Sequence, residues 1–519
     1  MPDPISAGNG ALSLAAAALR RGVWMLSRSF RLHRPRGAFC HRGWCQQCRV
    51  TLGDGRVVLA CQTDEATSAP LVRPRRYGRL AGLLAEAAPP WFYEQRFLRP
   101  RRLRQFYLER LRRLSAAPSL PPAIPAAATA FEDLACTSLV VGGGLAGLAA
   151  AKSLALAGRR VVLVEAERLG GSARWIPGPA TRVQAAVDAA RAAGVDCREG
   201  MLCAGLYDDP DRALCVGAHG TLVIRFETMV LATGAYDQLP TIPGNDLPGI
   251  IGMRAFERLA AQRALPSNVR IGIYGHRLET ERALAAATAS GRDIDWIAGP
   301  GELPDAPLRR NAGATLVRVW GRGRVGSVEF APGGRVECDL LVIALSQATY
   351  ELQAQLGFPP RLAGEPAVPL PGVVARRRLL VVGEAAGEYD VARAGAVASA
   401  AVDAWIGKDR VAVDRGPGVA SGREQIQAVV SKPAADDAFL CLCEDVRVRD
   451  VRAAIADGYR DVELIKRHTG AGTGPCQGKL CHVALSRCLA ESGLDVRLPT
   501  ARPLVRPVPL ACFAGRPDE

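Results

Sequence analysis

The sequence predicts an α/β chain with a two-dinucleotide-binding, Rossmann-like core between a small N-terminal β-grasp-like domain and a small C-terminal helical domain. Three observations support this prediction: a strand, glycine turn, helix and strand in residues 137–165, and a set of four spaced cysteines on each side of it. The chain has 519 residues, which is too long for one hydrophobic core and suggests about three domains. A hydrophobic content of 49% and a charged content of 23% are typical of a globular protein.

The predicted core begins with a short apolar, β-branched run at residues 137–141. The next six residues, Gly142-Gly143-Gly144-Leu145-Ala146-Gly147, have the G-x-G-x-x-G spacing, and an Ala-rich helical stretch follows over 148–157. A second strand at 160–164 ends in Glu165. The glycines permit a tight turn and the close approach of a pyrophosphate, while the acid can accept hydrogen bonds from a ribose. The expected dinucleotide contacts are Gly142, Gly144, Leu145, Ala146, Gly147 and Glu165.

Three further patterns favour FAD over NAD as the bound dinucleotide. Gly170-Gly171 follows Glu165, residues 230–235 contain the Ala-Thr-Gly strand end of two-dinucleotide flavoproteins, and residues 379–387 match their late acidic strand. The acid of that late strand normally meets the ribityl chain of the flavin as Asp, but here it is Glu384. We expect the longer side chain to shift this contact or to bridge through water. The pattern adds Gly170, Gly171, Thr233, Gly234, Gly383 and Glu384 to the expected cofactor contacts.

The second nucleotide-binding unit of such proteins is degenerate in this chain. A strand at 269–274 leads into Gly275-His276-Arg277-Leu278-Glu279, which keeps only the first glycine of the turn. The negative charge of Glu279 would repel a pyrophosphate. We therefore expect the fold to persist without tight nicotinamide binding. Binding of another nucleotide at this site remains an open alternative. This argues against an NAD(P)H-dependent reductase. No C-x-x-C lies near the flavin motifs, which excludes a disulfide-reductase mechanism, and no catalytic residue is identified.

The N-terminal cysteines have the spacing of a plant-type [2Fe–2S] site. Cys40, Cys45 and Cys48 follow a C-x4-C-x2-C pattern, and Cys61 comes after twelve further residues. Residues 57–60 are expected to form the strand that delivers Cys61. A structural zinc ion is the alternative, although zinc knuckles usually use C-x2-C pairs.

The C-terminal cysteines form a second set of four. Cys441 and Cys443 are followed after 32 residues by Cys476 and Cys481. Two short helices are expected between the pairs, at 449–456 and 462–467, before a glycine-rich loop whose N–H groups can donate to cluster sulfurs. This set predicts a second [2Fe–2S] cluster, again with zinc as the alternative.

The positive charge is concentrated near the N-terminus. Residues 1–130 contain 21 arginines, no lysine and 7 acidic residues, so nearly all of the +15 charge lies there. A basic region can bind nucleic acid, an anionic membrane or an acidic partner. Because no DNA-reading motif is present, we expect a docking surface for another subunit or a solvated face. The apolar stretch at 12–19 is far shorter than the ~20 residues of a spanning helix, and no signal peptide is evident, so a cytoplasmic chain without a membrane span is expected.

These patterns divide the chain into a series of predicted segments. They are a ferredoxin-like domain at 1–90, a basic helix and Pro-rich linker at 91–130, the two halves of the FAD domain at 131–250 and 346–415, the degenerate inserted domain at 251–345, a linker at 416–437, the helical [2Fe–2S] domain at 438–490 and an extended tail at 491–519.

Together these motifs resemble the family of sarcosine oxidase α subunits and of the flavoprotein subunits of opine oxidase and hydrogen cyanide synthase. The phrases that resemble the family are Ser27-Arg28-Ser29-Phe30 with residues 33–37 before the first cysteine, the Gly-Pro-Cys-Gln-Gly-Lys-Leu-Cys run at 474–481, and Arg506–Leu510. The segment around the last four cysteines also resembles the bacterioferritin-associated ferredoxin domain.

The resemblance implies an electron-transferring α subunit of a heteromeric amine, opine or imino-acid dehydrogenase or oxidase. Its partner would be a DAO-type, FAD-containing β subunit, and its acceptor would be oxygen, a quinone or a carrier protein. The resemblance also leaves room for an FMN at the subunit contact, although no residue here identifies one. Two alternatives remain open: a self-contained NAD(P)H-dependent flavin reductase of a ferredoxin-type acceptor, and a non-enzymatic iron–sulfur scaffold or sensor.

Overall fold

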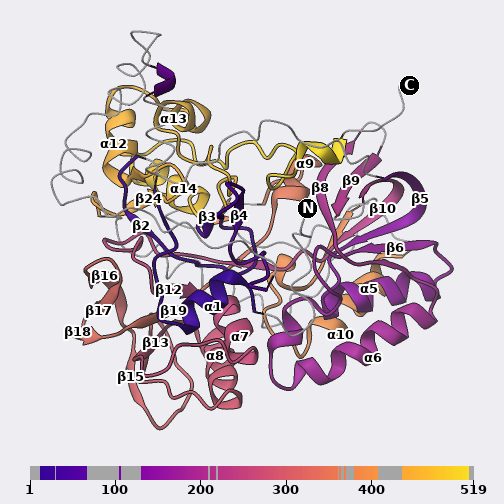
Figure 1. Cartoon of the computed structure of the whole chain (residues 1–519). Coiled ribbons are helices and arrows are strands. Elements are labelled where there is room, and N and C mark those ends of the chain that lie inside the picture. Colours follow the sequence, from indigo (N-terminus) through magenta and orange to yellow (C-terminus); the bar gives the residue numbers. More distant parts are fainter. Residues whose placement is uncertain are drawn as a thin grey trace.

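The computed structural model describes most of the chain outside the predicted linkers. The described residues are 12–29, 31–66, 104–106, 130–208, 211–217, 220–360, 362–363, 368–369, 379–406 and 435–513. Nearly all of the predicted basic helix and Pro-rich linker at 91–130 therefore lies outside them, as does most of the linker at 416–437. Two sheets with their helices lie side by side, and the C-terminal helices pack beside the second sheet (Figure 1). Within the described ranges, no helix has both the length and the apolar character needed to cross a membrane.

The first sheet has seven strands in the order β7-β6-β5-β10-β9-β8, with β23 pairing in parallel beside β10. Its strands are β5 (Ala130–Val141), β6 (Val161–Val164), β7 (Asp196–Arg198), β8 (Met201–Asp208), β9 (Asp211–Gly217), β10 (Gly220–Leu231) and β23 (Leu379–Val381). Both faces are buried, which explains the continuous apolar runs in its parallel strands. Helices α5 (Leu145–Leu156), α6 (Pro179–Ala192) and α10 (Ala394–Trp405) pack on one face. The alanines of α5 let it pack closely against α10.

The chain leaves the first sheet after β10 and returns to it only at β23. Between them lies a parallel sheet of five strands in the order β12-β19-β13-β14-β15. These are β12 (Ile250–Gly252), β13 (Ile271–Gly275), β14 (Trp296–Gly299), β15 (Arg309–Ala312) and β19 (Leu340–Ala344), covered by α7 (Met253–Ala261) and α8 (Arg277–Ala289). An antiparallel sheet adds β16 (Thr315–Gly321), β17 (Val325–Ala331) and β18 (Gly334–Glu337). The antiparallel pair β11 (Ala235–Asp237) and β20 (Ser346–Ala348) connects the two parts. The second unit is thus inserted into the first.

The N-terminal module is small and has short strands. Helix α1 (Leu14–Arg20) precedes two antiparallel pairs, β1 (Ser27–Arg28) with β2 (Pro35–Arg36) and β3 (Arg49–Thr51) with β4 (Val57–Leu59). The apolar stretch at 12–19 therefore forms a buried helix, capped by Ser13 and packed against α7 through Ala16 and Leu19. The strand expected at 57–60 is present as β4, directly before Cys61.

The C-terminal module contains the two helices expected between its cysteine pairs and one more. Its elements are β24 (Phe439–Cys441), β25 (Val446–Arg447), α12 (Val448–Ala456), α13 (Val462–Thr469), α14 (His482–Glu491) and η4 (Leu510–Phe513). The tail after α14 is extended but not wholly on the surface, because Val505 and Cys512 are buried. Val505 N donates a hydrogen bond to Ala204 O of β8 at 2.7 Å. The tail therefore connects this module to the first sheet.

The remaining described elements are short. They are η2 (Gly171–Trp175), α9 (Glu351–Gln355), β21 (Leu362–Ala363), β22 (Val368–Pro369) and η3 (Gly383–Ala386).

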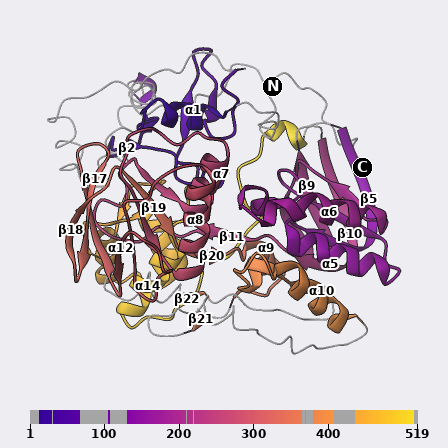
Figure 2. The ribbon, with the colours of Figure 1, turned by 90° about the horizontal axis from the view of Figure 1, so that it is seen from below.

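The N-terminal cysteine loop lies where the modules meet. Phe39 and Trp44 belong to one buried cluster with residues of the second sheet and with Phe439, Leu442 and Leu480 of the C-terminal module. The view in Figure 2 shows the N-terminal segment lying across the second unit, with α1 beside α7. This shared core holds the two cysteine segments in one packed assembly rather than on separate tethered domains.

Candidate functional site

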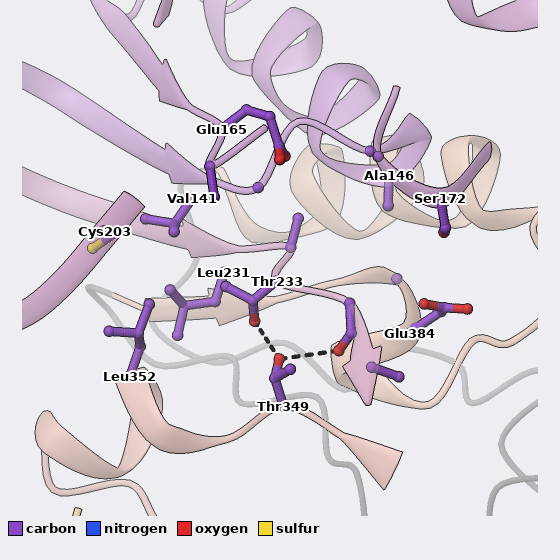
Figure 3. Close-up of a pocket in the computed structure, with 18 of the residues that line it drawn as sticks. Val141, Ala146, Glu165, Ser172, Cys203, Leu231, Thr233, Thr349, Leu352 and Glu384 are labelled. Atoms are coloured by element: carbon purple, nitrogen blue, oxygen red, sulfur yellow. Dashed lines mark hydrogen bonds between the residues drawn. The ribbon is translucent and has the colours of Figure 1, made fainter. Parts of the chain in front are cut away.

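A pocket opens where the parallel strands of the first sheet end, which is where α/β sheets bind ligands. Figure 3 shows Val141, Glu165, Leu231, Thr233 and Glu384 around it, each at or just beyond the end of a strand. Eleven of the twelve predicted cofactor contacts line it: Gly142, Gly144, Leu145, Ala146, Glu165, Gly170, Gly171, Thr233, Gly234, Gly383 and Glu384.

The glycines of the turn do three different things. Gly142 lets the turn pass close to β10, because it has φ +105° and a Cβ there would lie 2.2 Å from Ala232 O. A Cβ on Gly147, the twelfth predicted contact, would lie 1.8 Å from Gly142 O, so Gly147 allows helix α5 to pack against the turn rather than contacting a ligand. A Cβ on Gly144 would meet nothing within 4 Å, because Gly144 faces the pocket.

The N-terminus of α5 is open at the same place. Gly144 is its N-cap and supplies no side chain to satisfy the first N–H groups of the helix. Free N–H groups and the partial positive charge of a helix N-terminus attract a phosphate. The residues present therefore fit the pyrophosphate of a dinucleotide.

Glu165 is held in a fixed orientation at the end of β6. Its Oε2 accepts a hydrogen bond from Gly143 N at 2.7 Å, and its Oε1 accepts one from Glu167 N at 2.9 Å. Burial raises the pKa of this carboxyl group, against the opposing effect of the two N–H donors. The carboxyl group lies beside the glycine turn, as the ribose contact predicted from the sequence requires.

Glu384 is held by residues that the sequence analysis did not identify. Its Oε1 accepts hydrogen bonds from Arg254 Nη2 at 2.6 Å and from Arg282 Nη1 at 2.9 Å. Burial would raise the pKa of Glu384, but the two guanidinium groups lower it to about 2, so the group is a carboxylate at neutral pH. Arg254 also donates to Asp237 Oδ1 at 2.8 Å. The only sequence feature that pointed to a special environment for this carboxyl group was the Glu at position 384, where Asp is usual.

The N-terminal cysteine loop forms part of the pocket wall. Arg42 and Trp44 line the pocket, and Trp44 immediately precedes Cys45. The Trp44 ring lies 4.8 Å from the ring of Tyr236, another lining residue. Sequence reasoning missed these residues because no dinucleotide motif reaches the N-terminal module.

The C-terminal module approaches the pocket from another side. Tyr350 lines the pocket, and its Oη shares a hydrogen bond of 2.7 Å with Nδ1 of His482, the residue after Cys481. Burial lowers the pKa of His482 to about 3, so this imidazole is neutral. Arg506 of the tail also lines the pocket.

The four predicted N-terminal cysteines lie together and are buried. The Cys40 side chain contacts those of Cys45 and Cys61, and Cys61 also contacts Cys48. The backbone N–H groups of Arg42 and Cys45 each lie 3.4 Å from Cys40 Sγ. Four buried cysteines with N–H donors have the chemistry that a [2Fe–2S] cluster requires of its ligands.

The four C-terminal cysteines also lie together. Cys441 contacts Cys443 and Cys481, and Cys443 contacts Cys476. The backbone of Gly472, in the glycine-rich loop, lies next to the Cys441 side chain. Among the described residues, no group of three or more His, Cys, Asp or Glu has the arrangement to hold a metal ion. The fit at both sets therefore rests on donor chemistry and burial.

Three family models match separate parts of the chain. A 2Fe-2S iron-sulfur cluster binding domain matches residues 4–67, a pyridine nucleotide-disulphide oxidoreductase domain matches residues 137–275, and a sarcosine oxidase A3 domain matches residues 435–516. The first spans the N-terminal cysteines, the second the glycine turn, and the third the C-terminal cysteines.

Two relatives show the extent of the similarity. The sarcosine oxidase subunit alpha of Rhizobium meliloti is 27% identical over 97% of this chain and 56% of its own length. The chain is thus similar over most of its length to a sarcosine oxidase α subunit. It is also similar to the hydrogen cyanide synthase subunit HcnB of Pseudomonas aeruginosa, at 25% identity over 72% of this chain and 97% of that protein. The chain spans about half the length of the sarcosine oxidase subunits that it matches.

The fold has a counterpart among solved structures. L-proline dehydrogenase from P. horikoshii aligns with a TM-score of 0.67 and 18% identity, over 97% of this chain and 94% of that chain. These comparisons confirm the predicted fold class, a Rossmann-type flavoprotein core with an N-terminal 2Fe–2S domain. This chain thus carries an oxidoreductase domain of the flavoprotein type and an iron–sulfur domain.

Proposed function

We propose that this chain is the electron-transferring flavo-iron–sulfur α subunit of a heteromeric amine, opine or imino-acid dehydrogenase or oxidase. One observation supports this proposal above the others: the dinucleotide pocket is walled by Trp44, beside Cys45, and by Tyr350, which is hydrogen-bonded to the residue after Cys481. One flavin site between two iron–sulfur sites suits a protein that distributes electrons.

FAD would be held by the residues that line the pocket. The turn at Gly142–Gly147 would take the pyrophosphate, Glu165 the adenosine ribose and Glu384 the ribityl chain. When bound, a flavin supplies the chemistry that accepts an electron pair and releases single electrons to one-electron centres. Arg254 and Arg282 keep Glu384 ionised and oriented for its contact.

The two cysteine sets would each hold a [2Fe–2S] cluster, the first through Cys40, Cys45, Cys48 and Cys61 and the second through Cys441, Cys443, Cys476 and Cys481. The packed interfaces around both sets exclude water, since all eight cysteines are buried.

A partner subunit rather than NAD(P)H would supply the electrons. A Cβ on Gly275 would lie 2.1 Å from Ala344 O, so this glycine serves strand packing instead of opening a phosphate site. Glu279, fully buried in the first turn of α8, lies where a pyrophosphate would need positive charge. The electron donor in this proposal is a DAO-type, FAD-containing β subunit, and the acceptor is oxygen, a quinone or a carrier protein.

Co-purification from the native host tests the proposal. We expect a DAO-type flavoprotein to accompany the chain, and about four irons, four acid-labile sulfides and one FAD per chain. Flavin analysis of the complex also tests whether an FMN sits at the subunit contact. Full amine oxidation by the chain alone would overturn the division of labour. Rapid anaerobic bleaching of its flavin by NAD(P)H would favour the reductase, and a chain lacking flavin would favour a scaffold or sensor.

A further inference from the structure

One buried side chain contacts both cysteine sites. Gln47 lies between Cys45 and Cys48 in sequence and is 3% exposed. Its Nε2 lies 3.2 Å from Cys45 O and 3.5 Å from Cys443 Sγ. A side-chain amide carries two N–H donors, so both contacts can be made at once. One neutral amide thereby joins the backbone of the first site to a sulfur of the second.

Two arginines hold the second site against the first. Arg36 Nη2 donates to Cys443 O at 2.8 Å and to Leu442 O at 3.1 Å. Arg34, buried just before the first cysteine loop, pairs through its Nε with Asp445 Oδ1 at 2.6 Å and also donates to Leu442 O. Charge-assisted hydrogen bonds of this kind are strong and directional. The position of Cys443 relative to Gln47 is therefore built into the interface.

We propose that Gln47 is a positioning residue that couples the two cysteine sites by donating a hydrogen bond to Cys443 Sγ. The inference rests on the proposed function, because it needs the second set to hold an iron–sulfur cluster. A hydrogen bond to a ligand sulfur stabilises the reduced, more negative form of a cluster, so it raises the reduction potential. A hydrogen bond from the N-terminal module thus raises the reduction potential of the C-terminal site, which favours reduction of that site.

Gln62 provides a matched control. Its Nε2 lies 3.2 Å from Cys61 O and 3.9 Å from Cys61 Sγ, and it contacts sulfur only in the first set. Gln62→Leu therefore removes an amide next to a cysteine without touching the second site. Gln47→Leu removes the donor to Cys443, and Gln47→Glu replaces it with a group that carries negative charge at neutral pH.

The test is a redox titration of the purified full-length chain, followed by electron paramagnetic resonance, after its iron content has been measured. Loss of one signal in Cys48→Ser and of the other in Cys476→Ser assigns the signals to their sites. We expect Gln47→Leu to shift the C-terminal signal to a more negative potential, Gln47→Glu to shift it further, and Gln62→Leu to leave it in place.

Equal C-terminal potentials in Gln47→Leu and the unchanged protein, with iron retained, would overturn the inference alone. A single signal that belongs to the N-terminal set would instead overturn the second cluster of the proposed function, and this inference with it. If Gln47→Leu loses iron, Gln47→Asn is measured in its place. The Asn side chain keeps the amide but is one methylene shorter, so its N–H group lies farther from Cys443 Sγ. A negative shift in that variant supports the inference, and an unchanged potential overturns it.

Discussion

Arg254 Nη2 on α7 donates to Glu384 Oε1 at 2.6 Å, and so joins the inserted unit to the acidic residue of the dinucleotide pocket. Both groups are largely removed from water, with 1% and 10% of their side chains exposed. The inserted unit keeps only the first glycine of a nucleotide turn, yet its helices supply the two cations that hold Glu384. Its role at the first pocket is therefore structural and electrostatic.

Replacing Arg254 is expected to destabilise the chain. Arg254→Leu would leave Glu384 with one fewer partner and Asp237 as an uncompensated buried carboxyl group, which costs about 3–5 kcal/mol. Unfolding in urea should show the loss, and the FAD content of the purified variant should fall. Arg277→Ala is the control, since its pair with Glu281 is largely exposed and should contribute little to stability. Equal stability of the two variants would contradict the importance of the buried pair.

Filling the space beside Gly144 should block FAD without damaging the fold. Gly144→Val places a branched side chain where a Cβ meets no protein atom, in the space assigned to the pyrophosphate. We expect the FAD absorbance to be lost and the iron content to be retained. The control is Gly301→Ala, where a Cβ also meets open space but the residue does not line the pocket. Full FAD occupancy in Gly144→Val would place the pyrophosphate elsewhere.

Each cysteine set should carry half of the iron. We expect Cys48→Ser and Cys476→Ser each to lose about half of the iron and sulfide, because each removes one ligand from a different set. Cys488→Ala is the control, since Cys488 packs in the core of the C-terminal module outside both predicted sets. Iron loss of the same size in Cys488→Ala would contradict the assigned ligands.

Glu279 should make the stability of the chain depend on pH. Burial raises its pKa from 4.5 to about 7, although Arg282 and Arg254 oppose the rise. Between these pH values the folded state keeps a proton that the unfolded state releases, so stability falls as pH rises. Glu279→Gln is expected to raise the free energy of unfolding by about 3 kcal/mol at pH 8 and to change it little at pH 4.

Chemical denaturation across this pH range measures the effect of Glu279. Glu281→Gln, on the exposed side of the same helix, is the control and should leave the slope unchanged. A slope that persists in Glu279→Gln would assign the titration to another buried group. Asp237 is the next candidate, because burial raises its pKa to about 6.

The local units of the chain could be predicted because their residues are close in sequence. The glycine turn, the strand before it and Glu165 lie within thirty residues, and the geometry of one strand–turn–helix unit places them. Helices α12 and α13 follow from short amphipathic patterns and agree with the prediction to within two residues. The packing of the tail could not be predicted in this way, because Val505 hydrogen-bonds to a strand 300 residues earlier.

The sequence by itself determined the type of each site: a dinucleotide turn, two four-cysteine sets and a degenerate second turn. Residue type and spacing decide these, since backbone geometry limits what neighbouring residues can bind. Only the tertiary structure decided how the sites meet. The contact of Gln47 with Cys443 spans 396 positions and that of Arg254 with Glu384 spans 130, and no local pattern encodes either. Such contacts follow from the packing of the modules into one shared core, where burial makes each polar group require a partner.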